Sequence, residues 1–154
     1  MISLNQNLLL GVPLLDSEHQ ELADVINTIA AEASNHSMTQ EMPSPACCRR
    51  VGNLLQDLSQ LSAQHFATEE RMMEESCYPN LLEHRQEHRL MMAELKALIR
   101  ALCSGRECLT SRDLTSLKGW FIGHLATDDK PFAQYLLAQG LHQGFWPMRP
   151  ALAI

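Results

Sequence analysis

The segment from Val51 to Met73, VGNLLQDLSQLSAQHFATEERMM, carries a pattern from which the fold class can be predicted. Its apolar side chains recur every three or four residues, which is the spacing that lines one face of an α-helix. Two polar side chains, His65 and Glu69, stand on that face where apolar residues are expected. The segment is therefore predicted to be a core-facing helix with potential metal ligands in its buried stripe. The stripe consists of Val51, Leu54, Leu58, Leu61, His65, Glu69 and Met72.

Three further segments show the same periodicity, and local signals mark where the helices begin. Ser17 and Gln20 fit a capping box at the start of the first helix. Ser44 is a suitable N-cap for the second, and Pro45 suits its first helical position. No segment has the alternation typical of a strand. We therefore predict four long helices, at residues 17–35, 44–76, 79–105 and 110–138.

Each of the other three helices also carries potential ligands on its apolar stripe. These stripes are Leu15, His19, Leu22, Ile26, Ile29 and Ala33; Leu81, His84, His88, Met91, Leu95, Leu98 and Leu102; and Leu114, Leu117, Phe121 and His124, followed by Asp128 or Asp129. Four helices with one buried stripe each predict an all-α, up-down-up-down four-helix bundle. We expect a single domain over residues 1–154, with an N-terminal arm, a bundle at about 15–138 and a short C-terminal tail at 139–154.

Composition and charge exclude several classes of protein. Apolar residues make up 45% of the 154 residues, enough for one core, and the net charge of −6 argues against a nucleic-acid binder. No apolar run approaches the roughly 18 residues of a membrane span. No basic region precedes the short apolar stretch at residues 8–15, so a secretory signal is not indicated and we expect a cytoplasmic protein. The five cysteines include no CxxC pair, which favours reduced thiols over disulfides or a zinc site.

The polar residues on the four stripes converge toward one end of the predicted bundle. His19 lies near the start of the first helix, and His65 and Glu69 lie near the end of the second. His84 and His88 lie near the start of the third helix, and the fourth carries its histidine in its C-terminal half. Burying so many imidazoles and carboxylates without partners would be costly. Their common depth therefore points to a shared metal site.

Each element of this pattern is weak when taken alone. The His84-x-x-x-His88 pair also fits a solvated helix face beside Arg85, and Glu69 could belong to an exposed charged run. His19 or His124, considered singly, is more often a core histidine bonded to a neighbour. The specificity lies in the conjunction, because five of the seven histidines fall on four facing stripes. The other two, His36 and His142, are interpreted as structural or solvated.

The order of these residues resembles the hemerythrin family, in its bacterial branch of bacteriohemerythrins, over about residues 8–137. The motifs are GVPLLDSEH at residues 11–19, HFATEERMM at 65–73, Tyr78-Pro79, His84-x-x-x-His88, and His124-x-x-x-x-Asp129 followed by Lys130-Pro131. The resemblance implies a cofactor of two iron ions, Fe²⁺ or Fe³⁺, with a bridging oxo or hydroxo group. It further implies that His84, His88 and His124 hold one iron, that His19 and His65 hold the other, and that Glu69 and Asp129 bridge the two.

The fourth helix poses a problem of geometry at the second bridging carboxylate. On a straight helix Asp128, four residues after His124, shares the face of that histidine better than Asp129 does. The family pattern nevertheless selects Asp129. Pro131 cannot donate to the carbonyl of Thr127, and a local π-type turn would rotate Asp129 inward. We therefore predict irregular backbone hydrogen bonding around residues 124–131.

The ligand set implied by the resemblance points to reversible O2 binding, for storage, delivery or buffering, rather than to an enzyme. The iron with three histidines has six ligands when the bridge is counted, whereas the iron with two has five, which leaves one position for O2. Phe66, Trp120 and Phe121, which lie beside ligands in the sequence, are candidates for the wall of the O2 pocket. Two alternatives remain: a sensor of O2, NO or redox state that acts through a separate partner, and a di-iron enzyme that handles peroxide or NO. The sequence indicates no protein partner or oligomer.

Overall fold

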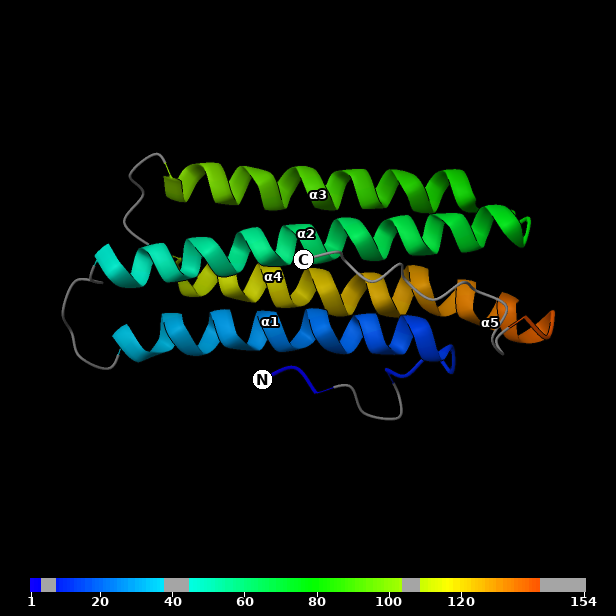
Figure 1. Cartoon of the computed structure of the whole chain (residues 1–154), viewed down its shortest axis with the longest axis horizontal. Coiled ribbons are helices and arrows are strands. Elements are labelled where there is room, and N and C mark those ends of the chain that lie inside the picture. Colours follow the sequence, from blue (N-terminus) through cyan, green and yellow to red (C-terminus); the bar gives the residue numbers. More distant parts are fainter. Residues whose placement is uncertain (4–7, 38–44, 104–108, 142–154) are drawn as a thin grey trace, which may run out of the picture.

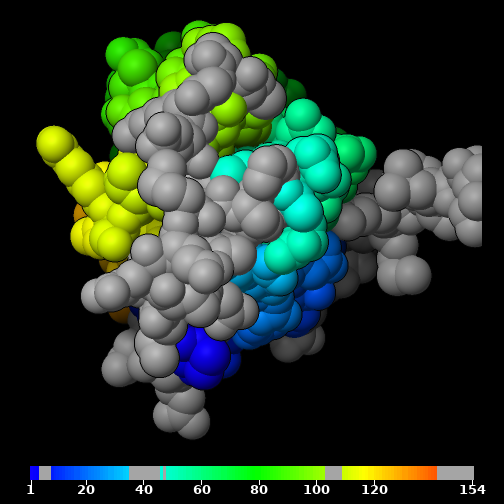
Figure 2. Space-filling view, turned by 90° about the vertical axis from the view of Figure 1, so that its left-hand side faces the viewer, coloured from blue at the N-terminus to red at the C-terminus, as the bar shows by residue number. Residues whose placement is uncertain are grey.

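The computed structural model describes residues 1–3, 8–37, 45–103 and 109–141. Its helices are α1 (Pro13–Ser37), α2 (Pro45–Glu75), α3 (Leu81–Cys103), α4 (Ser111–His124), a π-helical turn η1 (Leu125–Asp129) and α5 (Lys130–Ala138). The described residues contain no strand. Because the backbone at His124 and Lys130 is helical, α4, η1 and α5 form one continuous rod. The chain therefore folds as the predicted up-down-up-down four-helix bundle, with its rods side by side (Figure 1) and grouped around one axis when the molecule is seen from its end (Figure 2).

The beginning of α1 differs from the sequence prediction. The helix starts at Pro13, four residues before Ser17, so Ser17 is not its N-cap. The carboxylate of Asp16, in the first turn, instead accepts hydrogen bonds from the backbone N–H groups of Leu10 and Gly11, at 2.7 and 3.0 Å. Gly11 has a φ of +77°, which a residue with a side chain adopts only with strain. These two bonds tie the turn before the helix to its first turn, and the helix begins ahead of the predicted capping box.

The other helix boundaries follow the prediction closely. α2 begins at Pro45, as expected, and α4 follows an N-cap at Thr110. The Thr110 side chain accepts a hydrogen bond from the backbone of Asp113, whose carboxylate accepts one from the backbone N–H of Thr110. This reciprocal arrangement fixes the start of α4. The predicted tail lies outside the described residues after Leu141.

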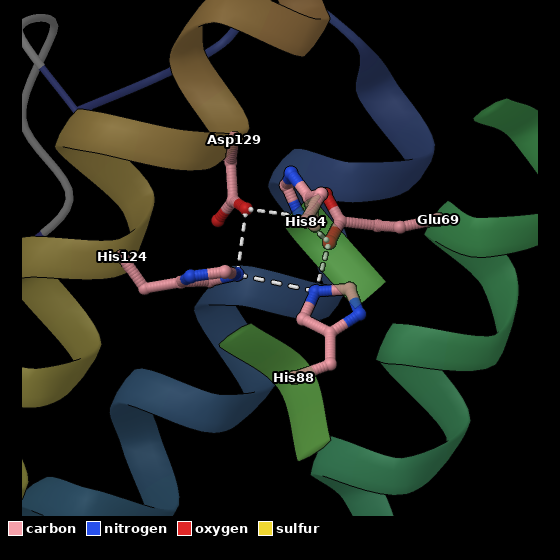
Figure 3. A group of neighbouring side chains, drawn as sticks. All are labelled: Glu69, His84, His88, His124 and Asp129. Atoms are coloured by element: carbon pink, nitrogen blue, oxygen red, sulfur yellow. Dashed lines mark hydrogen bonds and ion pairs between the residues drawn. The ribbon is translucent and has the colours of Figure 1, made fainter. Parts of the chain in front are cut away.

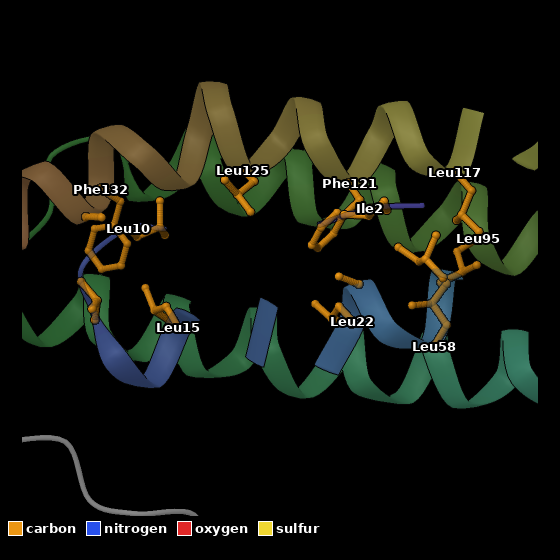
Figure 4. Packing of buried hydrophobic residues seen from close by; sticks show 14 of the residues in the cluster. Ile2, Leu10, Leu15, Leu22, Leu58, Leu95, Leu117, Phe121, Leu125 and Phe132 are labelled. Carbon is orange, nitrogen blue, oxygen red and sulfur yellow. The ribbon is translucent and has the colours of Figure 1, made fainter. Parts of the chain in front are cut away.

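The core is an apolar column between the four rods that contains residues of all four predicted stripes (Figure 4), although Leu54, Leu61 and Leu98 of those stripes are only partly buried. Leu15, Ile26, Ile29 and Leu58 are fully buried. The first residues of the chain also contribute, because Ile2 is buried and is held by Asn27 on α1. The N–H of Ile2 donates to Asn27 Oδ1 at 2.6 Å, and Asn27 Nδ2 donates to the Ile2 carbonyl at 2.7 Å. The predicted N-terminal arm is therefore anchored along α1 at this point.

Two cysteines can be compared with the expectation of reduced thiols. Cys77 is a free, exposed thiol in the turn after α2, where its φ of 54° helps to end the helix. Cys48, near the start of α2, is bonded in a disulfide. The prediction of a reduced thiol is therefore wrong at Cys48, because whether a cysteine forms a disulfide depends on tertiary proximity, which the sequence pattern does not reveal. Among the described residues, no helix is both long enough and apolar enough to cross a membrane.

Candidate metal centre

Seven polar side chains meet inside the bundle, and every helical rod supplies at least one of them. α1 contributes His19, α2 contributes His65 and Glu69, α3 contributes His84 and His88, α4 contributes His124, and η1 contributes Asp129. All seven are buried, with exposed fractions of 8% or less. The structure thus brings together all seven side chains that the sequence singled out.

Five of the seven form a group in which three imidazoles face two carboxylates (Figure 3). The Nε2 atoms of His88 and His124 lie 3.1 Å apart. Asp129 Oδ1 lies 3.0 Å from His124 Nε2 and 3.3 Å from His84 Nε2. Glu69 Oε2 lies 3.5 Å from His84 Nε2 and 3.3 Å from His88 Nε2. We refer to His84, His88 and His124 below as the three-histidine group.

The second group contains two imidazoles and the same two carboxylates. The Nε2 atoms of His19 and His65 lie 3.0 Å apart. Asp129 Oδ2 lies 3.2 Å from His19 Nε2, and Glu69 Oε2 lies 3.5 Å from His65 Nε2. We refer to His19 and His65 as the two-histidine group. Because Glu69 and Asp129 belong to both groups, they stand between the two sets of nitrogen donors.

The π-helical turn η1 accounts for the choice between the two neighbouring aspartates. Within this turn Asp129 is buried at 1% exposure, whereas the side chain of Asp128 is 31% exposed. The N–H of Lys130 donates to the carbonyl of Leu125, five residues back, which is the wide spacing of a π turn. The predicted irregularity around residues 124–131 is therefore confirmed, and it turns Asp129 into the site.

Three of the imidazoles also contact a carboxylate on their outer side. His65 Nδ1 donates to Glu18 Oε2 at 3.0 Å, and His88 Nδ1 donates to Glu70 Oε1 at 3.0 Å. His124 Nδ1 lies 3.5 Å from Asp128 Oδ2. Sequence reasoning missed these contacts. One feature of the sequence could have indicated them. Each of these carboxylates is next to a proposed ligand in the chain, and it therefore lies at the edge of the helix face that carries that ligand.

The charges within the cluster shift several pKa values through mutual attraction. Burial disfavours the charged form of His84, but the adjacent Asp129 and Glu69 outweigh it and raise its pKa to about 9. Burial and Asp129 oppose ionisation of Glu69, yet His65 and the contacts with His84 and His88 lower its pKa to about 2. For Asp129, burial is likewise outweighed by its histidine neighbours, which hold its pKa well below the usual range. Without metal, therefore, the cluster favours carboxylates facing protonated imidazole.

The donor atoms are consistent with a metal pair rather than with a self-contained polar network. Both carboxylate oxygens of Glu69, Oδ1 of Asp129 and Nε2 of His84 are buried and have no hydrogen-bond partner among the described residues. His84 Nε2 and Glu69 Oε2 lie 3.3 to 3.5 Å from the groups that face them, which is too long for good hydrogen bonds. Buried polar atoms normally find a partner, and metal coordination would supply one. Imidazole and carboxylate donors suit iron and other first-row transition metals.

The three aromatic residues predicted to line the pocket lie in different surroundings. Phe66 is buried and stacks on His88, with ring centroids 3.9 Å apart. Phe121 is buried edge-on to His19, at a centroid distance of 6.1 Å. Trp120 lines a cleft of about 150 Å³ together with Leu95 and Leu98 of α3. Phe66 and Phe121 thus lie directly against the imidazoles, while Trp120 faces the cleft between α3 and α4.

Comparisons with known proteins agree with this architecture. A family model described as the hemerythrin HHE cation binding domain matches residues 10–136. The chain is 26% identical over 140 residues to a bacteriohemerythrin of Ralstonia nicotianae, covering 91% of this chain and 92% of that protein. It is 31% identical over 111 residues to a myohemerythrin of Riftia pachyptila, covering 72% and 73% of the two chains.

A solved structure shares the fold. It is a crystal structure of a leucine-to-phenylalanine mutant, with a TM-score of 0.70 and 21% identity, and the match covers 82% of this chain and 88% of that one. The match to the family model extends over most of the residues from which the bundle and its polar cluster are built. The chain therefore belongs to the hemerythrin family.

Proposed function

We propose that this protein binds O2 reversibly at a pair of iron ions inside the bundle. The observation that carries the proposal is the unequal division of the nitrogen donors. Three imidazoles stand on one side of Glu69 and Asp129, and two stand on the other. A pair of metals bridged by these carboxylates would have one fewer protein ligand at the two-histidine group. That group would hold the position left for a small ligand.

The metal ligands in this proposal are His84, His88 and His124 for one iron and His19 and His65 for the other, with Glu69 and Asp129 bridging. When bound, the iron pair supplies the electrons and the open coordination position that reversible binding of O2 requires. The chain's own contribution is to hold seven donors at fixed positions on rigid helices. Neutral imidazoles predominate over carboxylates in this set, which distinguishes it from the carboxylate-rich di-iron sites of ferritin-like bundles. The protein thereby favours binding over oxidative chemistry.

The apolar side chains around the ligands support binding by excluding water. Phe121 packs edge-on against His19 of the two-histidine group, and Phe66 stacks on His88. Leu15 and Leu125 are fully buried in the same stretch of the core (Figure 4). A dry surrounding limits proton entry and so slows side reactions at a reactive metal centre. Bound O2 would therefore be released unchanged rather than consumed.

The test is metal content together with an optical spectrum recorded before and after exposure to O2. We expect two irons per chain and a spectrum that changes with O2 and returns when O2 is removed. His142→Ala, which alters a histidine outside the proposed ligand set, is the matched control and should keep both properties. Irreversible oxidation with turnover of added peroxide or NO would favour an enzyme instead. Native protein that contains only zinc would refute the O2 function.

A further inference from the structure

The three carboxylates on the outer side of the imidazoles differ in how deeply they are buried. Glu70, which contacts His88, is 24% exposed and also accepts a hydrogen bond from Arg85 Nε at 2.8 Å. Asp128, beside His124, is 31% exposed. Glu18 differs from both because only 3% of it is exposed. It is the most deeply buried of the three and contacts the two-histidine group.

The side chain of Glu18 on α1 contacts α2 beside the metal-ligand cluster. Its Oε2 accepts the hydrogen bond from His65 Nδ1 at 3.0 Å, and its Oε1 lies 3.3 Å from Thr68 Oγ1. Glu18 also directly precedes His19 in the chain. One buried carboxylate is thus joined to both nitrogen donors of the two-histidine group, to one through the backbone and to the other through a hydrogen bond.

We propose that Glu18 is a positioning residue that makes the two-histidine group a high-affinity metal position. This inference rests on the ligand set of the proposed function. A carboxylate that accepts from Nδ1 keeps the proton of His65 on that nitrogen and leaves the Nε2 lone pair directed at the metal. Its buried negative charge also strengthens His65 as a donor. Glu70 makes the corresponding hydrogen bond to His88 in the three-histidine group, but it also forms an ion pair with Arg85, which offsets part of its negative charge.

The proposal predicts a position-specific loss of affinity. Removal of such an outer carboxylate typically weakens metal binding about 10- to 100-fold. Glu18→Ala should show this loss at the two-histidine group and leave the three-histidine group nearly unchanged. Glu18→Gln keeps an oxygen that can accept from His65 but removes the charge, so its loss should be smaller. Glu70→Gln is the matched control and should weaken the position at His88 instead.

Metal-free chains of residues 1–154 would be titrated with Co²⁺ alone, against a competing chelator, and crystals at partial loading would locate the cobalt by anomalous diffraction. We expect two Co²⁺ per chain in the unaltered protein and early loss of the one at His19 and His65 in the Glu18 variants. Unchanged affinity there, or equal weakening at both positions, would overturn the proposal. If Glu18→Ala does not fold, Glu18→Gln decides the question. Unaltered protein that binds no Co²⁺ would refute the ligand set itself, whereas the O2 function is tested separately by the iron spectrum.

Discussion

Deleting Ala126, an exposed residue within η1, is the sharpest test of how the π turn serves the site. A regular helix advances about 100° per residue, so Asp129, five residues after His124, would lie about 140° away from it. The π turn absorbs one residue and brings both side chains to the same face. Without Ala126 the separation falls to four residues, and a regular helix then places the carboxylate about 40° from His124. The deletion should therefore convert η1 into ordinary α-helix and keep Asp129 inside.

The helix after the turn should also keep its orientation in this variant. Phe132 and Leu136 are fully buried, and burial of each such side chain contributes about 1.5 to 3 kcal/mol. Removal of the extra residue leaves Phe132 and Leu136 facing the core. We therefore expect the free energy of unfolding to fall by less than about 2 kcal/mol, which is smaller than the contribution from burying both side chains. The measurement is urea denaturation of the metal-free chain, combined with metal content after loading with iron.

The control is deletion of Gly119, which is exposed on the regular part of α4. There the helix has no extra residue to lose, so the segment from Phe121 onward turns by about 100° relative to the segment that ends at Leu117, and the two parts of the buried stripe no longer share one face. A rotation of about 100° would take about two buried side chains out of the core, which should lower the free energy of unfolding by about 3 to 6 kcal/mol. If deletion of Ala126 proves as destabilising as deletion of Gly119, or if it abolishes metal binding, our account of the π turn is wrong.

Three further outcomes are expected. His84→Ala should lose metal from the three-histidine group, as measured by iron per chain, and a variant that kept both irons and full O2 binding would contradict the assignment. In the metal-free chain, the raised pKa of His84, about 9 against an ordinary 6.5, contributes stability below pH 6.5 that is lost as the pH rises through 9. The lowered pKa of Glu69, about 2, contributes stability that is lost as the pH falls from 4.5 toward 2, so urea midpoints should peak between these ranges. Tyr135→Phe, which removes the 2.8 Å hydrogen bond to the Ser76 carbonyl, should lower the free energy of unfolding by about 1 kcal/mol, and an unchanged urea midpoint would show that the bond contributes nothing.

Periodicity was sufficient to predict the bundle and the meeting of six of the seven side chains, and it left the seventh as either Asp128 or Asp129. The stripe residues Leu58, His65 and Met72 are buried as their spacing indicated. The stripe was drawn too narrowly, however, because Leu55 and Phe66 on its flank are also buried. A core-facing helix buries a broad face rather than a single line of side chains.

The failures of prediction involve contacts that local pattern does not encode. Ser17 carries the letters of a capping box, but the turn at Leu10 and Gly11 allows the helix to begin earlier. The contact between Glu18 and His65 joins residues 47 positions apart and depends on the register between α1 and α2. The choice of Asp129 over Asp128 needed the family pattern as well as Pro131, because a straight helix favours the wrong aspartate.

The distribution of the seven side chains over every rod of the bundle has a consequence for amide hydrogen exchange. Opening any one helix would remove at least one donor from the cluster. Ions held there would therefore suppress the local openings of all the rods at once, since binding to the closed form alone lowers the population of every open form. Loading should slow exchange along the whole length of the molecule, including turns far from the cluster, and not only at the amides that surround it.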